Sequence, residues 1–154
     1  MKNEFMKRAI ELSIESVNTG GGPFGSVIVK DEKIIAEGFN KVTSTNDPTA
    51  HGEIVAIRKA CKSLNNFNLS GCELYSTCEP CPMCLSAIYW AHIDKVYYAN
   101  TRDDAKKIDF DDSLIYEQLT KSIKERKIRM TQLMRNEALK AFELWDKKTD
   151  KVKY

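Results

Sequence analysis

The chain has 154 residues, of which 42% are hydrophobic and 30% are charged, and its formal net charge at pH 7 is +2. This length suits one ordinary domain whose core needs no disulfides, and no stretch approaches the roughly 20 apolar residues of a membrane helix. The small net charge excludes a strong electrostatic footprint for nucleic acid and favours a small-molecule substrate.

The first half of the chain predicts a helix, a strand hairpin and a second helix. Apolar residues recur at helical intervals after Asn3, which is the expected cap, and the run Gly-Gly-Gly-Pro at 20–23 ends this helix. Three residues, 31–33, separate the next two apolar segments, which predicts a hairpin. The predicted elements are helices at 4–17 and 50–65 and strands at 24–30 and 34–39.

The second half continues with alternating strands and helices. The predicted elements are strands at 74–76, 95–99 and 128–134 and helices at 81–91, 113–124 and 136–147. The strand–helix–strand unit at 72–99 predicts two parallel strands joined by a right-handed crossover. We therefore expect one domain over residues 1–154, a three-layer α/β/α sandwich with a mixed five-stranded sheet.

The expected compartment determines how the five cysteines are interpreted, and it favours a metal or catalytic role for them. The N-terminus has mixed charges and no apolar h-region, so we expect no signal peptide and a cytoplasmic protein. An odd cysteine count in that compartment argues against a disulfide framework. Cys61 and Cys72 have the pattern of ordinary buried cysteines, and His92, after a predicted helix, is typical of a solvated capping residue.

Three side chains are candidate metal ligands: His51, Cys81 and Cys84. The i, i+3 spacing of the two cysteines places both sulfurs on one helix face. The start of a helix favours the thiolate form, which is the form that binds zinc. One nitrogen and two sulfurs leave a tetrahedral zinc ion with an open fourth position for water.

Glu53 indicates that this predicted metal site is catalytic. It lies two residues after His51, near enough to move protons at the metal without being a ligand. His51-Gly52-Glu53 and Pro80-Cys81-x-x-Cys84 together match the H-x-E and P-C-x-x-C signature of zinc-dependent base deaminases. The two halves, in this order with a strand between them, predict such an enzyme.

Other interpretations of the cysteines remain open at this point. A lone C-x-x-C is also typical of a redox pair. The cysteines at 78, 81 and 84 resemble the start of a ferredoxin cluster run, but Ile88 stands where the next cysteine is needed. Cys78 is an alternative fourth ligand, which would make a closed structural zinc site and leave Glu53 without a role.

Two long phrases of the sequence, at 21–61 and 74–91, resemble the bacterial guanine deaminases, a family of the cytidine-deaminase-like superfamily. The segment Phe-Asp-Asp-Ser at 110–113 and the terminal Lys-x-Tyr are also similar, and Gly52 departs from the alanine expected there. The resemblance assigns the zinc and proton-transfer roles as above. It further implies substrate contacts from five residues: Asn40, Phe24, Trp90, Asp112 and Tyr154.

The resemblance implies hydrolytic deamination of guanine to xanthine and ammonia by a homodimer that exchanges its C-terminal segments. A tRNA adenosine deaminase shares both signature halves and is the nearest rival. Guanosine and other aminated heterocycles are rival substrates for the same chemistry. A non-catalytic zinc-binding module is the alternative from a different class.

Overall fold

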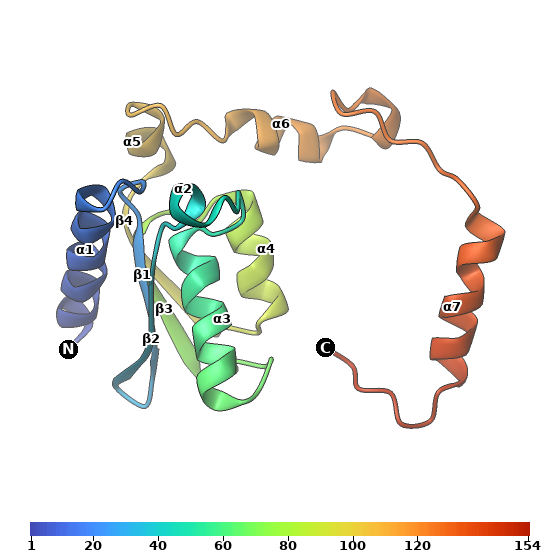
Figure 1. The fold of residues 1–154 in the computed structure, drawn as a ribbon, viewed down its shortest axis with the longest axis horizontal. Coiled ribbons are helices and arrows are strands. Elements are labelled where there is room, and N and C mark those ends of the chain that lie inside the picture. Colours follow the sequence, from blue (N-terminus) through green and yellow to red (C-terminus); the bar gives the residue numbers. More distant parts are fainter. The chain divides into compact units, whose positions relative to one another are not determined.

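The computed structural model describes residues 1–154, and the chain divides into two compact units, Met1–Asp112 and Ser113–Tyr154. The first unit contains a mixed sheet covered by helices on both faces, as predicted (Figure 1). The second unit contains only helices and connecting segments. Each unit is described by itself below.

The sheet of the first unit has four strands in the order β2-β1-β3-β4. Strand β1 pairs antiparallel with both β2 and β3, while β3 and β4 are parallel, as expected for the strand–helix–strand unit. The strands are β1 (Gly25–Lys30), β2 (Lys33–Phe39), β3 (Cys72–Cys78) and β4 (Lys95–Asn100). The hairpin turn between β1 and β2 consists of Asp31 and Glu32, both with positive φ, which suits the twist of the flanking strands.

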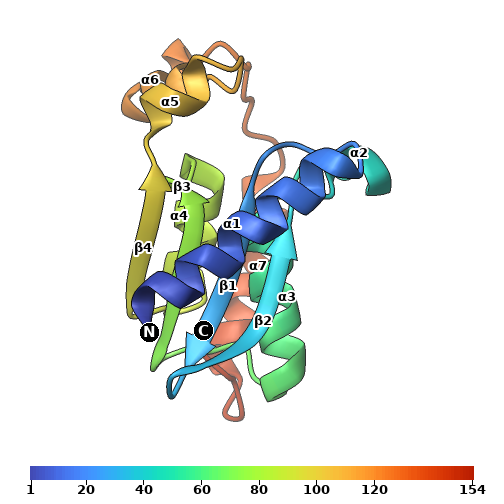
Figure 2. The same cartoon turned by 90° about the vertical axis from the view of Figure 1, so that its left-hand side faces the viewer.

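Helices cover the two faces of this sheet. The helices of the first unit are α1 (Lys2–Asn18), α2 (Val42–Thr45), α3 (Gly52–Leu64), α4 (Pro82–Trp90) and α5 (Arg102–Lys106). Helix α1 crosses one face, where Figure 2 shows it in front of the strands, and α3 and α4 lie behind the other face. None of the helices is both long and apolar enough to traverse a lipid bilayer.

The alternation of side chains along β1 and β3 builds the two cores. Val27 and Tyr75 point to the α1 face, where they pack with Leu12. Ile28 and Leu74 point to the opposite face and pack in the cluster formed by α3 and α4. Residues two positions apart share a face of a strand, and this parity also decides which side chains of β1 and β3 reach the site.

Two expectations about the elements were wrong. The sheet has four strands instead of the expected five, because residues 128–134 form no strand, and Ile128 is 80% exposed. This segment belongs to the second unit, which has no other strand to pair with, so its apolar residues cannot form a ladder. The first helix begins at Lys2 instead of after Asn3, which therefore does not cap it.

The second unit consists of α6 (Ser113–Thr120), a 3₁₀ helix η1 (Ile123–Glu125) and α7 (Arg135–Lys147). None of these three helices buries a residue. Several of their large apolar side chains are exposed, among them Leu119, Phe142 and Leu144. The unit therefore has no core of its own.

Gly38 brings β2 into direct contact with the start of α3. A Cβ atom at this position would lie 2.3 Å from the Gly52 carbonyl oxygen and 2.6 Å from the Ala56 backbone nitrogen. We expect Gly38→Ala to lower the free energy of unfolding by about 3 kcal/mol, because the backbone of α3 must move. Denaturant unfolding measures this loss.

The control for this variant is Gly20→Ala, which introduces only backbone strain. Gly20 has a φ of +83° and no atom within 4 Å of the added Cβ. We expect it to cost about 1 kcal/mol. Equal losses in the two variants would contradict the close packing of β2 on α3.

Candidate metal and catalytic site

The three predicted metal ligands lie at the N-terminal ends of two helices. His51 is the N-cap residue of α3, and Cys81 is the N-cap residue of α4. Cys84 is in the first turn of α4, and Pro82 occupies the first helical position, where the missing N–H needs no partner. The positive ends of both helices therefore point at one place and favour negative charge there.

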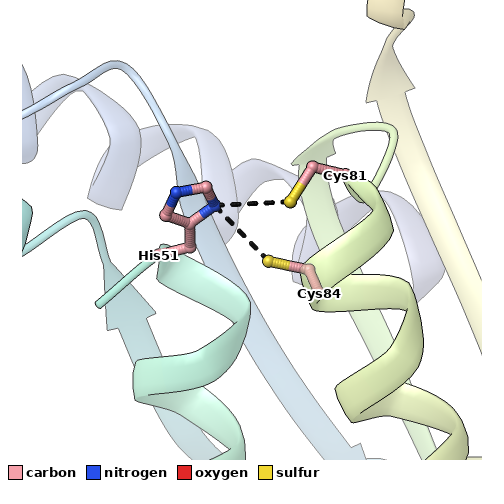
Figure 3. A group of neighbouring side chains, drawn as sticks. All are labelled: His51, Cys81 and Cys84. Carbon is pink, nitrogen blue, oxygen red and sulfur yellow. Dashed lines mark hydrogen bonds between the residues drawn. The ribbon is translucent and has the colours of Figure 1, made fainter. Parts of the chain in front are cut away.

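The ligand atoms of these residues lie close together (Figure 3). His51 Nδ1 is 3.6 Å from Cys81 Sγ and 3.5 Å from Cys84 Sγ. Ideal Zn–N and Zn–S bonds in a tetrahedron place nitrogen and sulfur about 3.6 Å apart. All three ligand atoms lie within 4.8 Å of one another, so the donor set and its spacing fit zinc with one open position.

Hydrogen bonds among the ligands determine which sulfur is ionised in the metal-free protein. The Cys84 thiol and then His51 lower the pKa of Cys81 to about 4. The hydrogen bond with Cys81, together with burial, raises the pKa of Cys84. The Cys81 thiolate in turn raises the pKa of His51. These hydrogen bonds therefore favour the thiolate form at Cys81 and the protonated thiol at Cys84.

Glu53 lies beside the ligands in the first turn of α3 and is 6% exposed. Burial raises the pKa of its carboxyl group. Its Oε2 atom is 3.5 Å from the Cys84 sulfur, whereas Oε1 accepts a hydrogen bond from Ser76 Oγ at 3.3 Å. The predicted proton-transfer residue is thus next to the metal ligands and is not one of them.

Two serines near Glu53 were missed by the sequence reasoning. Ser26 on β1 and Ser76 on β3 are buried, and Ser26 Oγ donates to Ser76 Oγ at 3.1 Å. They have the same parity as Ile28 and Leu74, which point into the core. The sequence did contain a signal for them, because each of two predicted strands has a serine at a position that faces the core.

Two of the predicted substrate-binding residues border the loop after β2 and the start of β1. Asn40 is 7% exposed, and its Oδ1 accepts a hydrogen bond from the backbone N–H of Val42 at 3.2 Å. The ring of Phe24 is half-buried and packs edge-on against Phe110, with ring centroids 4.9 Å apart. Phe110, which was not predicted as a site residue, therefore holds the segment before Asp112 against Phe24.

Asp112 is half-buried and pairs with Arg102 at 4.0 Å. The pKa of Asp112 is raised, mainly by burial and also by the nearby Cys81 thiolate. The Arg102 guanidinium opposes this shift. The Glu79 carboxylate accepts a hydrogen bond from the Arg102 backbone N–H at 3.2 Å. The loop that carries Cys81 is therefore tied to the start of α5, next to Asp112.

Two further predicted substrate-binding residues, Trp90 and Tyr154, are not among the metal ligands. Trp90, the last residue of α4, is 65% exposed and lines a groove of about 460 Å³ between α3 and α4. Ile54, Ile57 and Met83 line the same groove, and the metal ligands do not. Tyr154 ends the second unit, so its role at the site stays a prediction.

The remaining cysteines and His92 are outside the metal group. Cys78 is buried, its Sγ donates to the Thr101 carbonyl oxygen at 3.6 Å, and burial raises its pKa to about 11. Cys72 is buried as predicted, whereas Cys61 is only half-buried. His92 is exposed and has a φ of +56° just after α4. This arrangement favours an open site with three protein ligands.

Known proteins share this sequence and fold. Residues 1–100 match the family model described as the cytidine and deoxycytidylate deaminase zinc-binding region. The chain is 54% identical over 151 residues to a guanine deaminase of Bacillus subtilis (strain 168), with 97% of each chain covered. It is 43% identical over 98 residues to a tRNA-specific adenosine deaminase of Aquifex aeolicus, covering 64% of this chain and 65% of that protein.

Solved structures give the same relationship. The X-ray structure of guanine deaminase from Bacillus subtilis superposes with a TM-score of 0.95 at 53% identity, covering 99% of this chain and 98% of that chain. A structure of guanine deaminase from Nitrosomonas europaea superposes with a TM-score of 0.67 at 28% identity, covering 89% of this chain and 70% of that chain. The likeness to the Bacillus structure therefore extends over both units.

Proposed function

Because the chain belongs to the zinc-binding family of cytidine and deoxycytidylate deaminases, we propose that it hydrolyses guanine to xanthine and ammonia. The observation that carries the reaction type is the buried Glu53 carboxylate beside the His51, Cys81 and Cys84 ligand set. The choice of guanine rests on the 54% identity to a guanine deaminase along 97% of each chain.

Each residue of the site has a distinct part in this reaction. His51 Nδ1 and the two cysteine sulfurs would hold the zinc ion, which would supply an activated water and a Lewis acid. Glu53 accepts one proton of the attacking water and delivers it to a ring nitrogen of the purine. The second water proton then passes through Glu53 to the exocyclic amine, so that the C–N bond breaks, the carbonyl forms and ammonia leaves. The N-terminal ends of α3 and α4 favour the negative charge that develops.

Selectivity for guanine is assigned to the residues that surround this centre. The buried carboxamide of Asn40 is suited to donate a hydrogen bond to the purine, and the Phe24 ring offers a face for stacking. Asp112, held near Arg102, is suited to accept hydrogen bonds from ring or amino N–H groups. We assign Trp90, like Phe24, to lining the base pocket, and Asp112 and Tyr154 to closing it.

The first experiment is ammonia release from the zinc-loaded protein, with guanine, guanosine, adenine and cytosine offered separately. Release from guanine is the expected result. Release from another base or nucleoside would keep the reaction and change the substrate. No ammonia from any of the four, together with inosine formation in tRNA, would favour a tRNA adenosine deaminase. The chain is 43% identical over 98 residues to one such enzyme.

We also propose that the protein acts as a homodimer that exchanges its C-terminal segments, in a reducing compartment such as the cytoplasm. The helices after Asp112 bury no residue, and the groove between α3 and α4 is lined by apolar side chains. Residues 113–154 contain more basic than acidic residues, whereas residues 1–112 contain more acidic than basic ones. These opposite charges favour attraction between the C-terminal segment of one copy and residues 1–112 of another. Covering these surfaces with a second copy explains why they are apolar.

Mixing two inactive variants tests whether Tyr154 serves the partner subunit. One variant carries Glu53→Gln with an intact C-terminus, and the other keeps Glu53 but lacks the last two residues. If the tail acts in the neighbouring site, the refolded mixture should regain about a quarter of wild-type activity, since half of the dimers are mixed and each has one complete site. No recovery in a mixture that contains mixed dimers would contradict the exchange.

A further inference from the structure

Two serine hydroxyls form a hydrogen-bonded chain that ends on the Glu53 carboxylate. Ser26 Oγ donates to Ser76 Oγ at 3.1 Å, and Ser76 Oγ donates to Glu53 Oε1 at 3.3 Å. Ser26 is 0% exposed and Ser76 is 1% exposed. The two hydroxyls therefore lie wholly inside the protein. They reach Oε1 of Glu53, whereas the Cys84 sulfur contacts Oε2.

The strands fix the positions of these hydroxyls. Ser26 and Ser76 are directly opposite each other in the antiparallel pairing of β1 and β3. One residue further along, the Gly25 backbone N–H donates to Thr77 Oγ1 at 3.0 Å, which secures the register at this end of the sheet. Cross-strand neighbours on one face have closely spaced side chains, so the serine pair is held without freedom to drift.

Both serines occupy positions where apolar residues would be expected. They continue the row of Ile28 and Leu74, which belongs to the core beneath α3 and α4. A buried hydroxyl costs free energy unless it is hydrogen-bonded, and these two find partners only in each other and in Glu53. A packing role alone would be met better by Ala or Val.

Gly52 lies beside the serine pair. A Cβ at this position would lie 3.4 Å from Ser26 Oγ, an ordinary van der Waals contact, and 3.3 Å from the Phe24 carbonyl oxygen. The alanine expected there from the resemblance would therefore also leave room for the Ser26 hydroxyl.

We propose that Ser76 is a positioning residue that orients the Glu53 carboxylate, and that Ser26 in turn orients Ser76. Ser76 anchors Oε1, which leaves Oε2 turned toward the metal ligands for proton transfer. A Glu side chain has several rotatable bonds, so one fixed oxygen restricts the other to a productive position. The inference rests on the proposed function only in that Glu53 transfers the proton.

Three variants of the zinc-loaded protein test this role: Ser76→Ala, Ser26→Ala and the double variant. Losing a hydrogen bond to a carboxylate predicts a decrease of about tenfold in kcat for Ser76→Ala, and about threefold for Ser26→Ala. KM should stay within about twofold, because neither hydroxyl binds guanine. The double variant should have the kcat of Ser76→Ala, since Ser26 acts only through Ser76.

The matched control is Tyr75→Phe. Tyr75 is 1% exposed, and its hydroxyl donates to Glu73 Oε2 at 2.8 Å on the α1 face of the sheet, away from Glu53. This variant should lose stability like the others, measured by thermal unfolding, and keep its kcat. A kcat for Ser76→Ala equal to that of Tyr75→Phe, or Ser26 and Ser76 effects that multiply, would overturn the proposal.

An infrared measurement separates this inference from the guanine assignment. The carboxylate band of Glu53 is identified as the one lost in Glu53→Gln, and it should shift in Ser76→Ala while bound zinc remains stoichiometric. If the wild-type protein releases no ammonia from guanine, a shifted band still supports the positioning role and only the proposed function fails. An unshifted band means that Ser76 does not hold Glu53.

Discussion

Replacing Glu53 with Gln is expected to lower kcat for deamination by about 10²–10⁴-fold while the protein keeps its zinc. The amide retains the shape of the side chain and its contact with Ser76 but cannot accept and return a proton. Because Glu53 is not a member of the ligand group, the metal content should stay at one zinc per chain. Steady-state kinetics and atomic absorption on the same preparation measure both quantities.

A second Glu→Gln variant shows whether the loss is specific to the site. Glu37 pairs with Arg8 of α1 at 2.8 Å, and the hydrogen bond from Arg8 lowers its pKa. Glu37→Gln removes a carboxylate charge without touching the metal ligands, so its kcat should equal the wild-type value. Near-normal turnover in Glu53→Gln would remove Glu53 from the reaction.

Replacing Cys84 with Ala is expected to weaken zinc binding by about 10²–10³-fold, because the site loses one of three protein ligands. The hydrogen bond with Cys81 raises the pKa of the buried Cys84 thiol, which favours its protonated form before zinc binds. Zinc must displace that proton, so the wild-type affinity should increase with pH. Competition with a chromophoric chelator at several pH values measures both effects.

Cys78→Ala is the control for that experiment and a test of the closed-site alternative. Cys78 is buried, and its sulfur contacts the Thr101 carbonyl oxygen instead of the metal group. The variant should keep its zinc affinity and lose only stability, by about 1–2 kcal/mol. Loss of zinc from Cys78→Ala would mean a fourth sulfur ligand and a structural site.

The ligands and Glu53 could be found from the sequence because their chemistry depends on short spacings. Cys81 and Cys84 are one helical turn apart, and His51 and Glu53 are in another first turn, so local periodicity brings them together within each pair. The strand Gly25–Lys30 was also found locally, from a short run of β-branched apolar residues bounded by turn residues. Only the meeting of the two helix ends required the tertiary fold.

The features that sequence reasoning missed depend on partners far away in the chain. Residues 128–134 have the composition of a strand, but a strand exists only where a neighbour pairs with it, and their unit has none. Ser26 and Ser76 are 50 residues apart, and their hydrogen bond follows from the register of β1 and β3. Neither fact is visible in a local window.

The use of His51 and Cys81 as N-cap residues sets a limit on how stable this fold can become without losing its chemistry. Neither side chain accepts a hydrogen bond from the first turn of its helix. Asp or Ser at position 51 or 81 would cap α3 or α4 and add about 1 kcal/mol of stability to the metal-free protein. A selection for heat resistance alone would therefore favour substitutions that delete the metal site, so engineering of this enzyme must select for turnover and thermostability together.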